Sequence, residues 1–294
     1  MKRLLRFSVI KERIKVDLKH IINFYWAELK SYGVWWVWNI PFQVASICVG
    51  IASYFFFTKL FVARNPAYLP YGDPISFIIM GLATNTLLHV SLTVYYETIS
   101  ALYGGRVGVF GGLRVSQIDY LYLARIPPYT FIIARVSLRY FTHTILLFLY
   151  ILAGTYIFGL RINPRANIQL ATIFIVLGVL ACSGIGLVSA SMYWFLGTYR
   201  GVEPIRWFVT LMAPLVSGIY YPIDVLPPEL RAISYFLPHT YAVRGVREAL
   251  LYGSSISKVS SDLVALLLFT ALVPIGVVLV RKSLSVARKR GVIY

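Results

Sequence analysis

Charged side chains are scarce in this sequence: they make up 13% of its 294 residues, whereas hydrophobic residues make up 59%. Soluble domains carry about 25% charged residues. The mean hydropathy is +0.73, which means more apolar surface than a core of this size buries. The composition excludes an ordinary soluble protein and indicates an integral membrane protein with lipid around its apolar surface.

Acidic side chains are especially rare. The sequence has 11 Asp and Glu against 28 Lys and Arg, a formal net charge of +17. Nucleic-acid-binding proteins also carry such an excess, but there the cations gather on a polar surface. Here they flank apolar runs, a distribution that suits anionic lipid headgroups. The pattern predicts membrane lipids as partners and no nucleic acid.

Side chains that bind metals or carry out hydrolysis are few. Cys48 and Cys182 lie in apolar runs, and the four histidines are scattered. No cysteine pair has zinc spacing, and neither H-E-x-x-H nor G-x-S-x-G occurs. The glycines of 104–112 lack the lysine and hydroxyl residue of a P-loop. We therefore expect no metal site, no cofactor held by this chain and no enzymatic activity of its own.

Apolar runs dominate the rest of the chain. A helix of about 20 apolar residues crosses the hydrocarbon of a bilayer. The runs predict an all-α integral membrane protein with six transmembrane helices. They lie at about 35–61, 75–97, 138–158, 168–196, 207–221 and 262–280. Pro41, Pro214 and Pro274 fall inside these runs and are expected to kink or interrupt the helices.

The distribution of Lys and Arg predicts the orientation of the six helices. If the N-terminus is inside, twenty of these cations fall on inner segments and eight on outer ones. Cytoplasmic loops carry the excess of Lys and Arg in membrane proteins. We expect a multi-pass protein of the cell membrane with both termini in the cytoplasm.

Residues 1–34 are predicted to form an interfacial segment built on an amphipathic helix at about 7–32. One face is apolar, and Lys11, Lys15 and Lys19 form a basic stripe four residues apart. Such a helix lies in the plane of the headgroups. Its apolar positions are Ile10, Ile14, Leu18, Ile21, Ile22, Tyr25 and Leu29. Residues 35–294 then form the transmembrane domain.

Two loops stand out by length and composition. The inner loop, 98–130, begins with a glycine-rich stretch and continues into Gln117–Arg125, which is expected to form a short helix that docks a cytoplasmic partner. A flexible loop is the alternative. The outer segment, 222–261, has short apolar pieces divided by prolines. It predicts one or two re-entrant helices that line or cover the outer end of a pathway, because irregular backbone at membrane depth needs protein or water around it.

Polar residues inside the runs are candidates for that pathway. On the second run they follow at intervals of four, and on the fifth at four and three. The candidates are Asn85, His89 and Thr93, and then Thr210, Pro214 and Ser217. Polar groups in a membrane face a cavity or the interior of the bundle; helix packing is the alternative. Glu97, near the inner interface, is expected to pair with an arginine of the inner loop.

The stretch from Ser217 to Arg247 resembles the signature of type-2 ABC transporter permeases. The matching residues are Ser217-Gly218, Tyr221-Pro222, Leu226-Pro227, Leu230, Pro238, Thr240, Gly245 and Arg247. Gln117–Pro127, which reads QIDYLYLARIP, is similar to the coupling segment of the same family. The additional glycine-rich stretch, 98–113, departs from the family pattern.

The resemblance implies a pair of permeases, identical or homologous, above two P-loop ATPase subunits that bind ATP and Mg. The N-terminal and inner-loop helices would contact the ATPase, and the second and fifth spans would line the path. The implied coupling residues are Gln117, Asp119, Leu121, Arg125 and Pro127. The implied outer gate consists of Tyr221, Pro222, Leu226, Pro227 and Pro238.

The expected function is therefore that of a permease subunit of an ABC exporter. Its substrate would be amphipathic: a lipid, peptide, drug or glycan. An ion-coupled secondary transporter is one alternative, but it needs ion-binding groups near the midplane, and only His89 approaches that requirement. A membrane scaffold without transport activity is another, although it would not account for the re-entrant outer segment.

Overall fold

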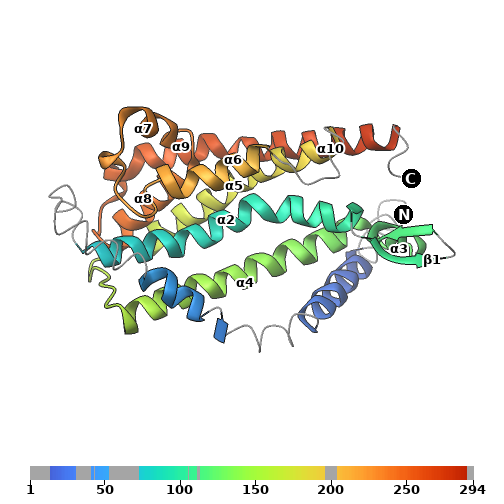
Figure 1. The fold of residues 1–294 in the computed structure, drawn as a ribbon, viewed down its shortest axis with the longest axis horizontal. Coiled ribbons are helices and arrows are strands. Elements are labelled where there is room, and N and C mark those ends of the chain that lie inside the picture. The colour runs from blue at the N-terminus through green and yellow to red at the C-terminus, as the bar shows by residue number, and fades with distance from the viewer. Residues whose placement is uncertain are drawn as a thin grey trace, which may run out of the picture. The chain divides into compact units, whose positions relative to one another are not determined.

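The computed structural model describes residues 14–30, 41–42, 44–52, 73–104, 106–110, 113–195 and 204–289. These residues are mostly helical, with one small β-hairpin (Figure 1). The long helices are α2 (Pro74–Gly104), α4 (Pro128–Ile157), α5 (Ile168–Phe195), α6 (Pro204–Val216), α8 (Pro238–Leu250), α9 (Ser260–Thr270) and α10 (Leu272–Lys289). The short elements are β1 (Arg106–Phe110), β2 (Leu113–Ser116), α3 (Gln117–Leu123), η2 (Ile223–Val225), α7 (Pro228–Ser234) and η3 (Ile256–Val259).

Four helical stretches of the described chain are long and apolar enough to cross a membrane. They are Pro74–Tyr103, Pro128–Ile157, Ile168–Met192 and Ile256–Val286. These four correspond to the second, third, fourth and sixth predicted runs. Of the first run, only 41–42 and 44–52 are described; they are helical, and Ile47 and Ile51 are buried. The total of six spans remains a prediction.

The fifth predicted helix is shorter than expected. The run at 207–221 suggested a helix to residue 221, but α6 ends at Val216 because Gly218 takes a positive φ of 75°, which ends a helix. With 13 residues, α6 is about 20 Å long, less than the roughly 30 Å of hydrocarbon. Residues 217–221 instead form a bend that returns the chain toward η2.

The boundaries of two other helices differ from the predicted runs. α4 begins at Pro128, ten residues before the predicted start at 138. The first turns of the helix include Arg135 and Arg139, whose charges are paired with Glu28 and Glu97. α2 continues beyond residue 97 to Gly104, and its last turns bury Leu102. Both extensions shorten the inner loop expected at 98–130.

The break between α9 and α10 confirms the predicted effect of Pro274. Proline has no N–H to donate to the carbonyl four residues earlier and its ring crowds that carbonyl. Here that residue is Thr270, where α9 ends, and α10 begins at Leu272.

The inner loop contains a hairpin that the sequence did not indicate. β1 pairs antiparallel with β2, with Arg106 opposite Ser116 and Phe110 opposite Leu113, and the register is irregular between Arg106 and Gly108. The chain passes from β2 directly into α3, so the expected short helix at Gln117–Arg125 is confirmed over Gln117–Leu123. Part of the glycine-rich stretch, 98–113, belongs to strand β1.

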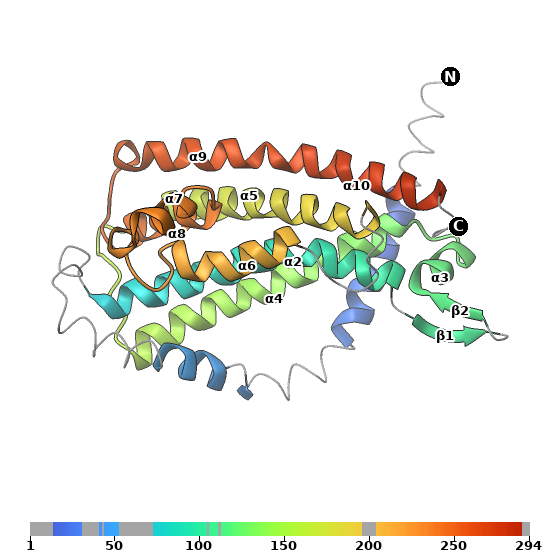
Figure 2. The same ribbon diagram turned by 45° about the horizontal axis from the view of Figure 1, so that its top comes forward.

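By their internal contacts the residues form two compact units: unit 1 is Met1–Phe42 with Glu97–Phe141, and unit 2 is Gln43–Tyr96 with Thr142–Tyr294. α2 and α4 contribute residues to both. In unit 2, α5 packs against α8, α9 and α10 (Figure 2). The core there includes Phe174, Ala242 and Val246, all almost fully buried. α5 is therefore the central helix of unit 2.

Unit 1 holds the N-terminal helix, which is described over 14–30. Phe24 packs edge-on against Phe131 of α4, with the ring centroids 5.7 Å apart. Glu28 pairs with Arg135 at 3.5 Å, and the Tyr129 hydroxyl donates a hydrogen bond to Asp17. The helix thus has a protein-facing side as well as an apolar side left exposed. The exposed apolar residues are Ile14, Val16, Leu18, Ile22 and Trp26.

On the exposed apolar side Ile14, Leu18, Ile22 and Trp26 follow at intervals of four and form one stripe. The interfacial role of this helix remains a prediction.

Within unit 1, Glu97 also pairs with Arg139 of α4, with Oε2 and Nη2 3.7 Å apart. Glu97 therefore pairs with an arginine as expected, but this arginine belongs to α4 and not to the inner loop expected at 98–130.

Candidate functional site

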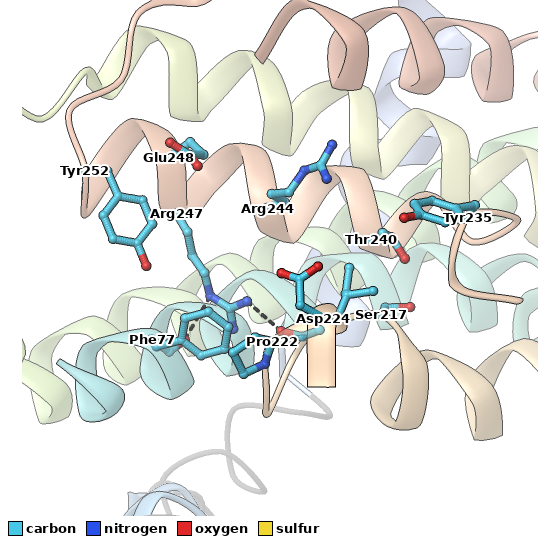
Figure 3. A pocket seen from close by; sticks show the side chains of 12 residues that line it. Phe77, Ser217, Pro222, Asp224, Tyr235, Thr240, Arg244, Arg247, Glu248 and Tyr252 are labelled. Atoms are coloured by element: carbon cyan, nitrogen blue, oxygen red, sulfur yellow. Dashed lines mark hydrogen bonds between the residues drawn. The ribbon is translucent and has the colours of Figure 1, made fainter. Parts of the chain in front are cut away.

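A buried arginine organises one end of unit 2. Arg247 lies near the end of α8 and is only 4% exposed. Its Nε donates to the carbonyl of Phe77 at 3.0 Å, Nη1 to that of Gly218 at 2.5 Å and Nη2 to that of Ile219 at 2.7 Å. One side chain therefore joins α8 to the first turn of α2 and to the bend that follows α6 (Figure 3).

The surroundings of Arg247 leave little free space. Its Cζ lies 3.4 Å from the centroid of the Phe77 ring, a close cation–π contact. A Cβ at Gly81 would overlap both the Ile219 carbonyl and Nη2 of Arg247, so only glycine fits there. Burial lowers the pKa of Arg247 to about 9, and the side chain stays protonated at neutral pH. We call Phe77, Gly81, Gly218, Ile219 and Arg247 the Arg247 cluster.

A cavity of about 220 Å³ lies beside the Arg247 cluster. The wall combines aromatic rings, two guanidinium groups, two carboxylates and several hydroxyls, a mixture typical of ligand pockets. It is lined by Phe77, Ser217, Gly218, Pro222, Ile223, Asp224, Tyr235, Thr240, Arg244, Arg247, Glu248 and Tyr252. Ser217 is 1% exposed, and its hydroxyl has no hydrogen-bond partner among the described residues.

Two ion pairs connect α8 to the segment that follows it. Arg244 donates through Nε, at 2.7 Å, and Nη2 to the buried carboxylate of Asp262, and this hydrogen bonding raises the pKa of Arg244. Glu248 accepts from Lys258 Nζ at 2.9 Å. Arg244 points away from Arg247 although it lies only one turn earlier (Figure 3). The two arginines of α8 therefore have different partners: Arg247 belongs to the Arg247 cluster, and Arg244 binds Asp262 of α9.

The predicted pathway residues are only partly brought together. Ser217 reaches the cavity, whereas Asn85 is half-buried, His89 is exposed and Thr93 is buried along α2. Thr210 and Pro214 are half-buried on α6, and the Thr210 hydroxyl has no hydrogen-bond partner in the described chain. Their role in a pathway remains a prediction.

Some buried polar contacts were missed by sequence reasoning. His239, taken as one of four scattered histidines, is fully buried, with Nδ1 3.8 Å from Sγ of Cys182 on α5. Arg247 was noted only as part of a family signature. The signal for it was an arginine among apolar and small residues of an amphipathic helix, which does not by itself show which side the arginine faces.

The residues expected at the outer gate have clear structural positions. Tyr221 donates its hydroxyl hydrogen to the Leu215 carbonyl, and Leu226 is buried. Pro222 precedes η2, Pro227 precedes α7, and Pro238 is the first residue of α8. Proline suits the first turn of a helix because the missing N–H has no partner there anyway. The prolines thus mark the starts of η2, α7 and α8, and α7 and α8 are the two helices that the sequence suggested for segment 222–261. Their depth in a membrane remains a prediction.

The expected coupling residues lie in and after α3. Gln117 begins the helix, Asp119 accepts from the Ser116 N–H at 2.7 Å and from its hydroxyl at 2.6 Å, and Leu121 is 5% exposed. Leu121 packs with Leu102, Ile118 and Phe131. Arg125 has a positive φ of 56°, and Pro127 precedes α4. The exposed face of α3 consists instead of Tyr120, Tyr122 and Leu123.

We expect Asp119→Ala to loosen the start of α3, because loss of an N-terminal cap costs about 1 kcal/mol. Hydrogen–deuterium exchange of the purified protein should show faster exchange of the α3 amides. The control is Asp73→Ala, which removes a carboxylate that precedes α2 and accepts from the Ser76 N–H and hydroxyl, and which leaves α3 unchanged. Unchanged exchange in α3 would show that the contact with Ser116 does not stabilise the helix.

The long apolar helices together define a multi-pass membrane protein. A family model for the ABC-2 type transporter matches residues 37–251. The chain belongs to this family and is a membrane-spanning transport subunit, a class that is not itself catalytic. The match extends through α8 and the Arg247 cluster.

Among curated proteins, the chain is similar to the linearmycin resistance permease protein LnrN of Bacillus subtilis (strain 168). The two are 31% identical over 126 residues. That stretch is 42% of this chain and 30% of the relative's length. The similarity is to a permease, in agreement with the family.

Proposed function

We propose that this chain is the membrane subunit of an ATP-driven exporter. ATP and Mg would bind a separate P-loop ATPase subunit, and two permeases, identical or homologous, would form the transmembrane part in the cell membrane. The observation that carries the proposal is the family match across residues 37–251, which covers most of the chain. The Lys and Arg distribution supports cytoplasmic termini.

Unit 1 is the proposed contact with the ATPase. α3 is short, follows the hairpin and presents the exposed apolar residues Tyr120, Tyr122 and Leu123. Tyrosine is one of the residues that most often anchor protein interfaces. In this proposal Leu121 and Asp119 hold α3 in place from inside, and the exposed residues, with Arg125, meet the partner. Pro127 lies between α3 and α4, so a movement of α3 caused by the ATPase would be transmitted through it to α4.

The substrate is proposed to be amphipathic, and its path to follow Asn85, His89 and Thr93 on α2 and Thr210, Pro214 and Ser217 on α6. The segment from Tyr221 to Pro238 would form the outer gate. The relative's name refers to resistance to linearmycin, and this supports a drug-like substrate over a lipid, peptide or glycan. ATP binding must favour one conformation over another for any such movement to occur.

The test is purification of the chain from its native membranes in a mild detergent, followed by mass spectrometry of the proteins that accompany it. We expect a P-loop ATPase at one copy per permease. The control is another multisubunit complex of the same membranes that stays intact in that detergent. Recovery of this chain alone, while the control complex is preserved, would contradict the proposal and favour ion-coupled transport.

A further inference from the structure

Arg247 makes contacts that differ from those of an ordinary surface arginine. All three guanidinium nitrogens donate to backbone carbonyls, and these belong to two segments distant in sequence from α8. Two of the carbonyls, at Gly218 and Ile219, lie in the bend directly after α6. The planar fork of arginine reaches three acceptors at once, which the single ammonium group of lysine does not.

Arg247 is one of several contacts that hold the bend, beside the buried side chain of Ile219 and the hydrogen bond from the Tyr221 hydroxyl to the Leu215 carbonyl. α6 ends at Val216, and the described residues 217–221 contain no regular helix or strand to hold them. The Arg247 hydrogen bonds draw Gly218 and Ile219 against α2, where Gly81 leaves room for them. Ser217, immediately before these carbonyls, is enclosed at the edge of the cavity.

We propose that Arg247 is a positioning residue for transport, holding the bend after α6 against α2 and thereby keeping Ser217 enclosed at the edge of the cavity. Release of the Gly218 and Ile219 carbonyls would let the bend move away and expose Ser217 to the cavity. The inference rests on the proposed function, because it assumes that the end of α6 moves during an ATP-driven cycle.

The chemistry of the cluster suits such a release. Breaking contacts to a buried charge is costly unless water or another polar group replaces them. The adjoining cavity supplies hydroxyls and carboxylates, from Ser217, Thr240 and Asp224 among others, and space for water. While Arg247 holds the bend, backbone carbonyls and the Phe77 ring surround its charged guanidinium. After release, water and the polar groups of the cavity would surround it instead. The charge therefore has polar partners in both arrangements.

The experiment uses Ser217→Cys as a reporter in a background that carries Cys48→Ser and Cys182→Ala. The permease is purified in detergent with its co-purifying ATPase, and its reaction with a maleimide is followed with and without a non-hydrolysable ATP analogue. In this reporter, Arg247→Lys is compared with Arg165→Lys, the same substitution at an exposed arginine before α5. Detergent removes any dependence on membrane sidedness.

We expect slow labelling of the reporter without nucleotide and faster labelling with the analogue. Arg247→Lys should label about tenfold to a hundredfold faster without nucleotide, because hydrogen bonds to a charged group are lost, and should no longer respond to the analogue. Loss of the nucleotide response is the readout that a merely structural residue would not change. Arg165→Lys should behave like the reporter alone.

The outcomes separate the two proposals. If the reporter responds to nucleotide and Arg247→Lys behaves identically, the positioning role is overturned while the exporter stands. If Arg247→Lys accelerates labelling but the ATP analogue changes the labelling of neither the reporter nor its variants, Arg247 holds the bend as proposed. The proposal that ATP drives its movement is then contradicted. Should Arg247→Lys not yield monodisperse protein, Arg247→Gln is the second variant, because its short neutral side chain loses the guanidinium hydrogen bonds to Gly218 and Ile219; equal labelling of that variant and the reporter would overturn the positioning role.

Discussion

Gly245→Ala is expected to prevent α8 from packing on α5 and to abolish most recovery of folded protein. A Cβ at residue 245 would overlap Cγ, Cδ1 and Cε1 of the Phe174 ring. Phe174 is fully buried at the centre of unit 2, so the ring has little room to move. Overpacking of this kind costs about 1–3 kcal/mol and sometimes more. The measurement is the monodisperse fraction on size-exclusion chromatography, together with the melting temperature.

Gly50→Ala is the matched control, because among the described residues no atom outside its own helix backbone and chain neighbours lies within 4 Å of a Cβ placed there. Phe174→Leu combined with Gly245→Ala should recover part of the loss, since it removes ring atoms from the overlap. A double-mutant cycle then gives the coupling between the two sites. Normal recovery and melting of Gly245→Ala would show that α8 and α5 do not approach as closely as described.

Leu123→Asp is expected to detach the ATPase while leaving the permease folded. Leu123 ends α3 and is 79% exposed, so a carboxylate there stays in water in the free permease. In an interface it would be desolvated without a partner, and anchor residues of interfaces contribute about 2 kcal/mol or more. We expect at least about a tenfold loss in ATPase recovered per permease, measured by affinity purification and mass spectrometry.

Leu230→Asp on α7 is the control, because it places the same charge at a partly exposed leucine of unit 2. Leu121→Asp gives the contrasting case: the buried side chain should unfold unit 1 and lower the recovery of the permease itself. If Leu123→Asp retains the ATPase in full, the exposed face of α3 is not the contact surface.

The sequence predicted best the bounds of the helix that is apolar along its whole length. The run at 168–196 matches α5, Ile168–Phe195, because this helix is apolar throughout. The start of α4 was missed because Arg135 and Arg139 lower the local hydropathy, and their partners Glu28 and Glu97 are distant in sequence. A hydropathy value reflects only the free-energy cost of placing that residue type in lipid. It does not include an ion pair with a distant residue that lowers this cost.

The candidate site was predictable in outline only. The prolines at 222, 227 and 238 marked the start of η2, α7 and α8, since proline restricts the backbone locally. The role of Arg247 was not predictable, because its three acceptors are carbonyls of other segments and every residue has a carbonyl. The same holds for Leu121, whose burial depends on Leu102 and Phe131.

The sequence by itself determined that this is a membrane protein, where its main apolar helices lie and which family it belongs to. These properties follow from composition, run length and local backbone chemistry, which act on residues near each other in the chain. Only the tertiary structure decided that Gly81 and Gly245 are points of close helix contact and that Arg247 binds the bend after α6. Close packing and buried hydrogen bonds join segments far apart in the chain, so their partners are defined only when the helices have come together.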